Sequence, residues 1–144
     1  MAEAAAAGVE RIVAIGVGRA SSERAVALSR EHPGVRAAVG VHPNDADGFR
    51  EADLAWLAEL AALPEVVAIG ECGLDFHRDH ARPDSQRRAF SAQIGLAREV
   101  GLPLVIHTRD AARETLDVLA AEADGHPVVL HCFSLTDHLD EVVE

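Results

Sequence analysis

Short apolar segments alternate along the chain with longer segments whose apolar residues recur at helical spacing. The short segments consist almost entirely of Val, Ile, Leu and Ala, which is typical of strands in a parallel sheet buried on both faces. The longer segments place their apolar residues on one face, as an amphipathic helix does. The pattern predicts strands at 11–18, 35–41, 66–70, 103–106 and 128–130, and helices at 22–30, 52–63, 84–100 and 111–123.

The strand-like segments begin at a spacing that is typical of successive βα units. Pro64 closes one predicted helix, Asp84 or Ser85 can cap the next, and Gly101 ends it. Five such units fit a doubly wound sheet, and they also fit part of a (β/α)8 barrel, which needs eight strands. The spacing alone leaves both architectures open.

Composition indicates one folded α/β domain over residues 1–144, since 49% of the residues are hydrophobic and no low-complexity linker interrupts the chain. The formal net charge of −11 argues against broad electrostatic attraction to nucleic-acid backbones or anionic membranes. No apolar run is long enough for a membrane span. We therefore expect a cytoplasmic chain with no membrane association and no obligate protein partner.

The two ends of the chain resemble interrupted helices. Residues 2–7 are an alanine-rich segment with no strand before it, and residues 139–144 form the first turn or so of another helix. These ends predict that the chain is a fragment at both termini.

Three side chains able to bind a metal lie directly after predicted strands: Glu71, His107 and His131. Functional groups collect at that edge of a parallel sheet. Strict alternation along the strand would place Val67, Ile69 and Glu71 on one face. One carboxylate and two imidazoles suit a divalent ion such as zinc or manganese, and a carboxylate can bridge two ions. The pattern predicts a metal site, although a single histidine at a strand end is usually a packing residue.

Two further side chains have alternative interpretations. His42 in Gly-Val-His-Pro-Asn either lines the site or forms part of a turn. Arg109 could meet a phosphate, or could pair with Asp110 or Asp75. The cysteines, Cys72 and Cys132, lack CxxC spacing and are predicted to be free thiols. No Gly-x-Ser-x-Gly or P-loop motif occurs, which disfavours serine hydrolases and P-loop nucleotide hydrolases.

Several motifs in this order and spacing resemble one family, the TatD-type metal-dependent deoxyribonucleases of the amidohydrolase-like superfamily. They are Gly-Val-His-Pro at 40–43, Gly-Glu-x-Gly-Leu-Asp at 70–75, His-x-Arg-x-Ala at 107–111 and His-Cys-Phe at 131–133. The resemblance implies a (β/α)8 TIM-type barrel, of which this chain would supply roughly strands two to six. The first strand and the last strands would be absent, which makes the barrel incomplete.

The resemblance also implies roles for particular residues. Glu71 matches the catalytic carboxylate that bridges two divalent metal ions, Mg, Mn or Zn, and His107 and His131 match two ligands of one ion. His42, Asp75 and Arg109 would line the substrate site. The first-strand Asp-x-His-x-His element and a later Asp of the family are missing here.

The implied activity is hydrolysis of DNA phosphodiester bonds by water activated at two metals. Because ligands of one metal are missing, we expect weak metal binding and little hydrolysis by these 144 residues alone. Two alternatives stay open. The chain could hydrolyse another ester or amide, such as a misacylated transfer RNA ester, or it could be a catalytically inactive barrel module.

Overall fold

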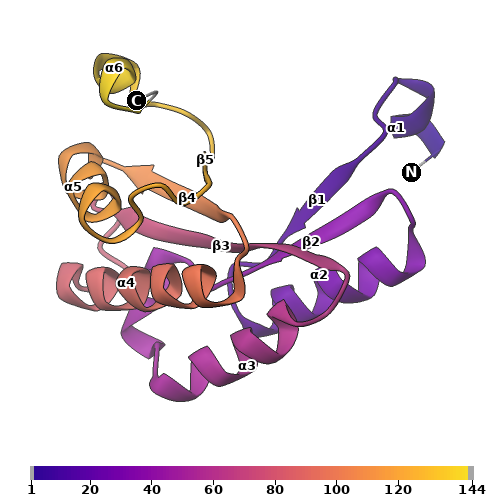
Figure 1. Ribbon diagram of the computed structural model, residues 1–144, viewed down its shortest axis with the longest axis horizontal. Coiled ribbons are helices and arrows are strands. Elements are labelled where there is room, and N and C mark those ends of the chain that lie inside the picture. Colours follow the sequence, from indigo (N-terminus) through magenta and orange to yellow (C-terminus); the bar gives the residue numbers. More distant parts are fainter. Residues whose placement is uncertain (1, 143–144) are drawn as a thin grey trace.

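The computed structural model describes residues 2–142 as a five-stranded parallel sheet with strand order β1-β2-β3-β4-β5 (Figure 1). Each strand is followed by at least one helix, so the chain winds through successive βα units. The elements are α1 (Ala2–Ala6), β1 (Ile12–Ile15), α2 (Arg19–Glu31), β2 (Val35–Val39), η1 (Pro43–Gly48), α3 (Glu51–Ala61), β3 (Val66–Asp75), α4 (Pro83–Val100), β4 (Leu104–Arg109), α5 (Ala112–Glu122), β5 (Val128–Leu130), η2 (Thr136–His138) and α6 (Leu139–Val142).

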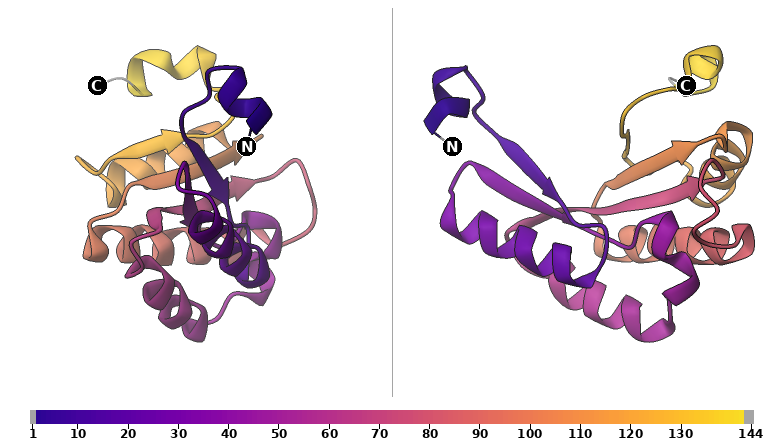
Figure 2. Two further views of the ribbon diagram at one scale, coloured as in Figure 1. Left: turned by 90° about the vertical axis from the view of Figure 1, so that its right-hand side faces the viewer. Right: turned by 180° about the vertical axis from the view of Figure 1, so that it is seen from behind.

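Helices α2, α3 and α4 pack along one face of the curled sheet, as the two views of Figure 2 show. The main hydrophobic core lies between this helical layer and the sheet, and it includes Leu57, Phe90 and Ile94. A second, smaller apolar cluster of Ala38, Ala68 and Val105 contains no helical residue and lies on the opposite face. The sheet is therefore covered by helices on its convex face.

Sequential strand order and a single helical layer identify a barrel segment rather than a doubly wound sheet, which would have helices on both faces. The incomplete barrel implied by the sequence is confirmed. The structure also confirms the existence and order of all five predicted strands and of the four predicted longer helices. Of the helix predicted at 139–144, residues 139–142 are helical, and residues 143 and 144 lie outside the described range.

Strands β3 and β4 are longer than predicted, and the added residues include the proposed metal ligands. Glu71 and His107 were expected just after their strands, whereas β3 continues to Asp75 and β4 to Arg109. The extension forms because the two strands stay hydrogen bonded up to the Asp75–Arg109 pair. The apolar sequence pattern ends at the polar residues of these segments, so the prediction stopped there, although both strands continue.

The expected common face for Val67, Ile69 and Glu71 is wrong. Ile69 is fully buried in the core beneath the helices, whereas Glu71 contacts His107 on the other side of the sheet. The β3–β4 register shifts between Ile69 and Cys72, and the pairing of β2 with β3 contains another shift. These irregularities interrupt the two-residue alternation of a regular strand.

Close approach of β3 to β4 requires a glycine opposite His107. Gly73 has a φ of +136°, and a Cβ atom there would lie 2.0 Å from the His107 carbonyl oxygen. No side chain fits in that space, and a positive φ is also unfavourable for residues other than glycine. Gly73 therefore allows the backbone of His107 to pair closely with the strand that carries Glu71.

Candidate metal centre

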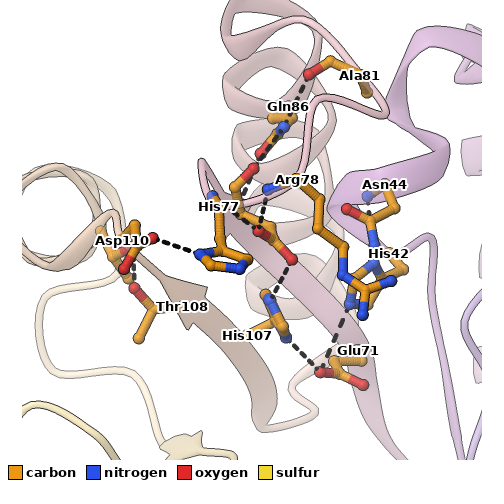
Figure 3. A network of polar contacts seen from close by, with 12 residues as sticks. His42, Asn44, Glu71, His77, Arg78, Ala81, Gln86, His107, Thr108 and Asp110 are labelled. Carbon is orange, nitrogen blue, oxygen red and sulfur yellow. Dashed lines mark hydrogen bonds and ion pairs between the residues drawn. The ribbon is translucent and has the colours of Figure 1, made fainter.

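Three side chains from different strand ends converge on the face opposite the helical layer: His42, Glu71 and His107 (Figure 3). Each offers a ligand atom, and these atoms all lie within 4.8 Å of one another. Glu71 and His107 come from β3 and β4, and His42 follows β2 directly before η1. The adjacent order of these strands brings the three side chains together.

His107 lies between two carboxylates. Its Nδ1 is 2.9 Å from Glu71 Oε1, and its Nε2 is 3.1 Å from Asp75 Oδ2. The Glu71 and Asp75 residues are 8% and 1% exposed, so both contacts are shielded from bulk water. Asp75 thereby fixes one ring nitrogen while the other faces Glu71.

The pKa shifts of these groups follow from the contacts. The hydrogen bond with Glu71 raises the pKa of His107 above its ordinary value, against the opposing effect of burial. The same hydrogen bond lowers the pKa of Glu71. Burial opposes ionisation of Asp75, but the Arg78 backbone N–H and His107 outweigh it, so the pKa of Asp75 is lowered. Without a metal, the cluster favours two carboxylates around a protonated imidazole.

His42 differs from His107 in its hydrogen bonding. Its Nδ1 accepts the backbone N–H of Asn44 at 3.1 Å, so the neutral ring carries its proton on Nε2. This Nε2 lies 3.8 Å from Glu71 Oε1. Burial and the nearby His107 lower the pKa of His42, which favours the neutral ring. His42 therefore presents an N–H donor to the site, and it could ligate a metal through Nε2 only after losing the Asn44 contact.

Two buried glutamines of α4 hold the segments that carry the cluster. Gln93 accepts the Val41 N–H and donates to the Val41 carbonyl, which fixes the backbone directly before His42. Gln86 accepts the Asp75 N–H and donates to the Asp75 carbonyl at the end of β3. Helix α4 thus positions two of the three strand ends. Neither glutamine was assigned a role in the site from the sequence, although polar residues on the apolar face of a predicted helix could have indicated one.

The structure places His131 and Arg109 outside this cluster. His131 follows β5, its side chain is exposed, and its Nε2 lies 3.2 Å from Cys132 Sγ. Its charge still contributes to lowering the pKa of Glu71. Arg109 is exposed at the end of β4 and has no carboxylate within 4.0 Å among residues 2–142, so neither predicted ion pair forms.

The donor set fits a divalent cation. In the protonated ring, Nδ1–H donates to Glu71 and Nε2–H donates to Asp75. If a cation replaced the Nδ1 proton, the contact with Asp75 would keep the remaining proton on Nε2 and leave the Nδ1 lone pair beside Glu71 for the cation. A carboxylate oxygen and an imidazole nitrogen that face each other in this way can bind one cation jointly. Asp75 then acts as the outer carboxylate that orients a ligating histidine.

The cysteines are both free, as the sequence predicts. Cys72 is completely buried, and burial raises the pKa of its thiol, which suppresses the reactive thiolate. Cys72 therefore packs in the core rather than serving as a nucleophile.

Comparison with protein families gives a match to the model described as TatD related DNase, over residues 1–141. The chain belongs to the TatD family. It is 46% identical over 127 residues to an uncharacterized metal-dependent hydrolase, YabD, of Bacillus subtilis, covering 88% of this chain and 50% of that protein. It is 44% identical over 138 residues to the 3′-5′ ssDNA/RNA exonuclease TatD of Cronobacter turicensis, covering 95% of this chain and 52% of that protein.

Solved structures have the same fold. The crystal structure of YJJV, a TatD homolog from Escherichia coli, superposes with a TM-score of 0.89 at 28% identity, covering 98% of this chain and 56% of that one. A TatD family hydrolase from Entamoeba histolytica gives a TM-score of 0.87 at 22% identity, which supports the fold. The chain spans about half the length of the curated relatives that it matches. Among residues 2–142, no helix is long and apolar enough to cross a membrane.

Proposed function

We propose that this chain carries the metal-binding part of a hydrolase that cleaves phosphodiester bonds in nucleic acid. The observation that carries the proposal is the arrangement around His107, whose Nε2 is fixed by Asp75 while its Nδ1 faces the Glu71 carboxylate. Glu71 and His107 would hold a divalent cation between them. His131, turned toward Cys132 here, is proposed as a further ligand from the family motif, and Glu71 would bridge a second ion in a complete site.

Each residue has a distinct task in the proposed reaction. A divalent cation supplies Lewis acidity toward a phosphoryl oxygen and lowers the pKa of water. Asp75 keeps the proton on Nε2 of His107, so the opposite nitrogen retains its lone pair. His42 directs its Nε2–H into the site, where it can donate to a nonbridging phosphate oxygen. During hydrolysis the water oxygen bonds to phosphorus, one P–O ester bond breaks, and the leaving oxygen takes up a proton.

The proposed substrate is a single-stranded nucleic acid. Relatives at 41% to 44% identity carry the name 3′-5′ ssDNA/RNA exonuclease. The net charge of −11 disfavours extensive contact with a long backbone, so binding must depend on a few groups near the metal. A short strand whose end enters the site satisfies this condition better than a duplex bound along its length.

The direct test is cleavage of a fluorescent single-stranded DNA oligonucleotide in the presence of Mg²⁺ or Mn²⁺, with EDTA as the metal-free control. Because ligands of one metal are missing, we expect only slow metal-dependent shortening of the strand, which Glu71→Gln abolishes. Glu99→Gln is the matched control, because Glu99 is exposed near the far end of α4. Cleavage of carboxylic esters without cleavage of DNA or RNA would contradict the proposal and favour another hydrolase reaction.

A further inference from the structure

We propose that Arg78 is the phosphate-binding residue of this site. Its guanidinium would bind a backbone phosphate of the nucleic acid next to the bond that is cleaved. This proposal rests on the proposed function for the identity of its ligand. Arg78 lies in the loop after β3, and its side chain is exposed. In Figure 3 this side chain extends from the loop toward His42 and Glu71.

The guanidinium of Arg78 is available for an anionic ligand. All 13 basic residues of the chain are arginines. Within the part of the chain that the structure describes, five of them have a carboxylate within 4.0 Å: Arg19, Arg30, Arg82, Arg87 and Arg113. Arg78 has no such carboxylate among residues 2–142, although Glu71 and Asp75 lie on the same face of the sheet. It therefore offers a positive charge beside the site.

Asp75 holds the backbone of the loop that carries Arg78. Its Oδ1 accepts the backbone N–H groups of His77 and Arg78, both at 3.1 Å, while its Oδ2 contacts His107. The two oxygens of one buried carboxylate therefore orient a proposed metal ligand and the start of the arginine loop together. A fixed backbone reduces the conformational entropy that Arg78 must lose when it binds a ligand.

Further contacts hold the loop on both sides. His77 Nδ1 lies 2.8 Å from Asp110 Oδ2, which ties the loop to the segment after β4. Arg82 contacts Asp47 Oδ1 through its backbone N–H and its side chain, which ties the loop to η1. Gln86 donates to the Ala81 carbonyl from inside α4. Arg78 thus projects from a loop that is anchored to three neighbouring elements.

The chemistry of a guanidinium fits a phosphodiester closely. Its planar N–H groups can donate two parallel hydrogen bonds to the two nonbridging oxygens of one phosphate. In a chain with a net charge of −11, an approaching anion needs such a local cation to offset repulsion from the carboxylates of the cluster. Arg78 would bind the strand, and Glu71 and His107 would hold the metal.

Binding of fluorescein-labelled dT10 and U10 to the full chain in EDTA, followed by anisotropy over a salt series, tests this proposal without hydrolysis. Arg78→Ala should weaken binding at low salt about tenfold or more, as loss of a charge-assisted contact does. It should also reduce the slope of log affinity against log salt by about 0.7, the value for one phosphate of a single strand. Arg78→Lys should keep the slope, since the charge remains, but bind less tightly than the parent chain.

Arg24→Ala is the matched control. Arg24 is also exposed, and its substitution removes the same charge from α2, which belongs to the helical layer. The proposal is overturned if Arg78→Ala binds like Arg24→Ala, or if the unsubstituted chain binds neither oligonucleotide. Similar weakening of dT10 and U10 binding by Arg78→Ala would support a contact with phosphate, which both strands carry.

Parallel cleavage assays separate this inference from the proposed function. Cleavage by the parent chain with unchanged KM in Arg78→Ala would refute the role of Arg78 and leave the hydrolase proposal intact. Loss of oligonucleotide binding in Arg78→Ala, in a parent chain that binds but does not cleave, would support the role of Arg78 and refute hydrolysis by this chain.

Discussion

Asp75 is the most constrained polar side chain of the site, since it is 1% exposed and uses both carboxylate oxygens. One oxygen accepts from the loop backbone and the other from His107 Nε2. This division makes Asp75 a positioning residue for His107, because it would hold the proton on Nε2 when a cation takes the place of the Nδ1 proton beside Glu71.

Substitution of Asp75 by Asn should weaken Mn²⁺ binding by about 10- to 100-fold, the usual cost of losing such a carboxylate. The amide can keep the loop contacts through its oxygen, but its NH₂ group cannot accept from Nε2–H. His107 would then prefer the tautomer with the proton on Nδ1, toward Glu71. Calorimetric titration of the two proteins measures the difference.

Asp117→Asn is the control for this substitution, since Asp117 is exposed on α5 and pairs with Arg113. Equal Mn²⁺ affinities for Asp75→Asn and Asp117→Asn would contradict the proposed orientation of His107.

The raised pKa of His107 predicts a pH dependence of stability in the metal-free chain. The stabilising contribution of protonated His107 is fully present below the pKa of about 6.5 that the residue has in the unfolded chain. This contribution is lost as the pH rises through the higher pKa of the folded chain. His42 shifts in the opposite direction, so its contribution is lost below pH 6.5 and does not affect the same range. We therefore expect the urea concentration at the unfolding midpoint, measured in EDTA, to decrease as the pH is raised from about 6.5 to 8.

The variant His107→Gln should lack this decline, because it removes the group that titrates. The pH range ends below 9.0, the ordinary pKa of the Cys72 thiol, so ionisation of this thiol does not contribute to the decline assigned to His107. An identical decline in the parent chain and in His107→Gln would show that another group is responsible.

Helix α4 links the core to the site through Gln86 and Gln93, which are 1% and 0% exposed. Both satisfy backbone N–H and carbonyl groups of segments that carry the cluster. Phe90 and Ile94 of the same helix fill the main core. The helix therefore contributes both hydrophobic burial and precise placement of two strand ends.

Replacing Gln93 by Leu should destabilise the chain by about 2 to 4 kcal/mol, because the Val41 N–H and carbonyl would be left buried without partners. Glu99→Ala, an exposed change on the same helix, should shift stability by less than about 0.5 kcal/mol. Urea denaturation monitored by circular dichroism measures both. A cost for Gln93→Leu no larger than that for Glu99→Ala would contradict the assigned role.

The apolar pattern predicted the order and type of the main elements because burial beneath a helical layer imposes a periodicity that sequence shows directly. It did not predict the extension of β3 through Glu71 to Asp75, because polar residues and glycines interrupt the apolar run there, although Cys72 and Leu74 pack in the core and the segment pairs with β4. The shifted register of β3 was likewise invisible to a strict two-residue alternation.

The sequence motifs indicated Glu71 and His107 as partners, and the structure brings them together with His42. Arg78 lay outside the residues singled out, because nothing in its immediate sequence shows where the loop directs it. The role of Asp75 depends on two oxygens with different partners, which is a property of the folded site. His131 as a ligand stays a prediction.

The outer strands of the sheet expose apolar side chains. Val13 on β1 is 45% exposed and Val129 on β5 is 55% exposed, and each of these strands pairs with one neighbour within the described part of the chain. Unpaired strand edges of this kind are sites for association between chains.

We expect the chain to self-associate in a concentration-dependent way, with a mass by light scattering above the monomer value of 15.3 kDa. Val129→Lys should shift the distribution toward monomer by placing a charge on the edge strand. Val100→Lys is the control, because Val100 is 37% exposed on α4, the helix that packs against the central strand β3. A sharp monomer peak at all concentrations would contradict the expectation.

The most direct test of the metal centre is calorimetric titration of the chain with Mn²⁺, beside the variants Glu71→Gln, His107→Asn and Glu99→Gln. We expect saturable binding of Mn²⁺ to the parent chain and to Glu99→Gln, and loss of binding in the other two variants. Binding that survives both Glu71→Gln and His107→Asn would show that these residues do not hold the metal.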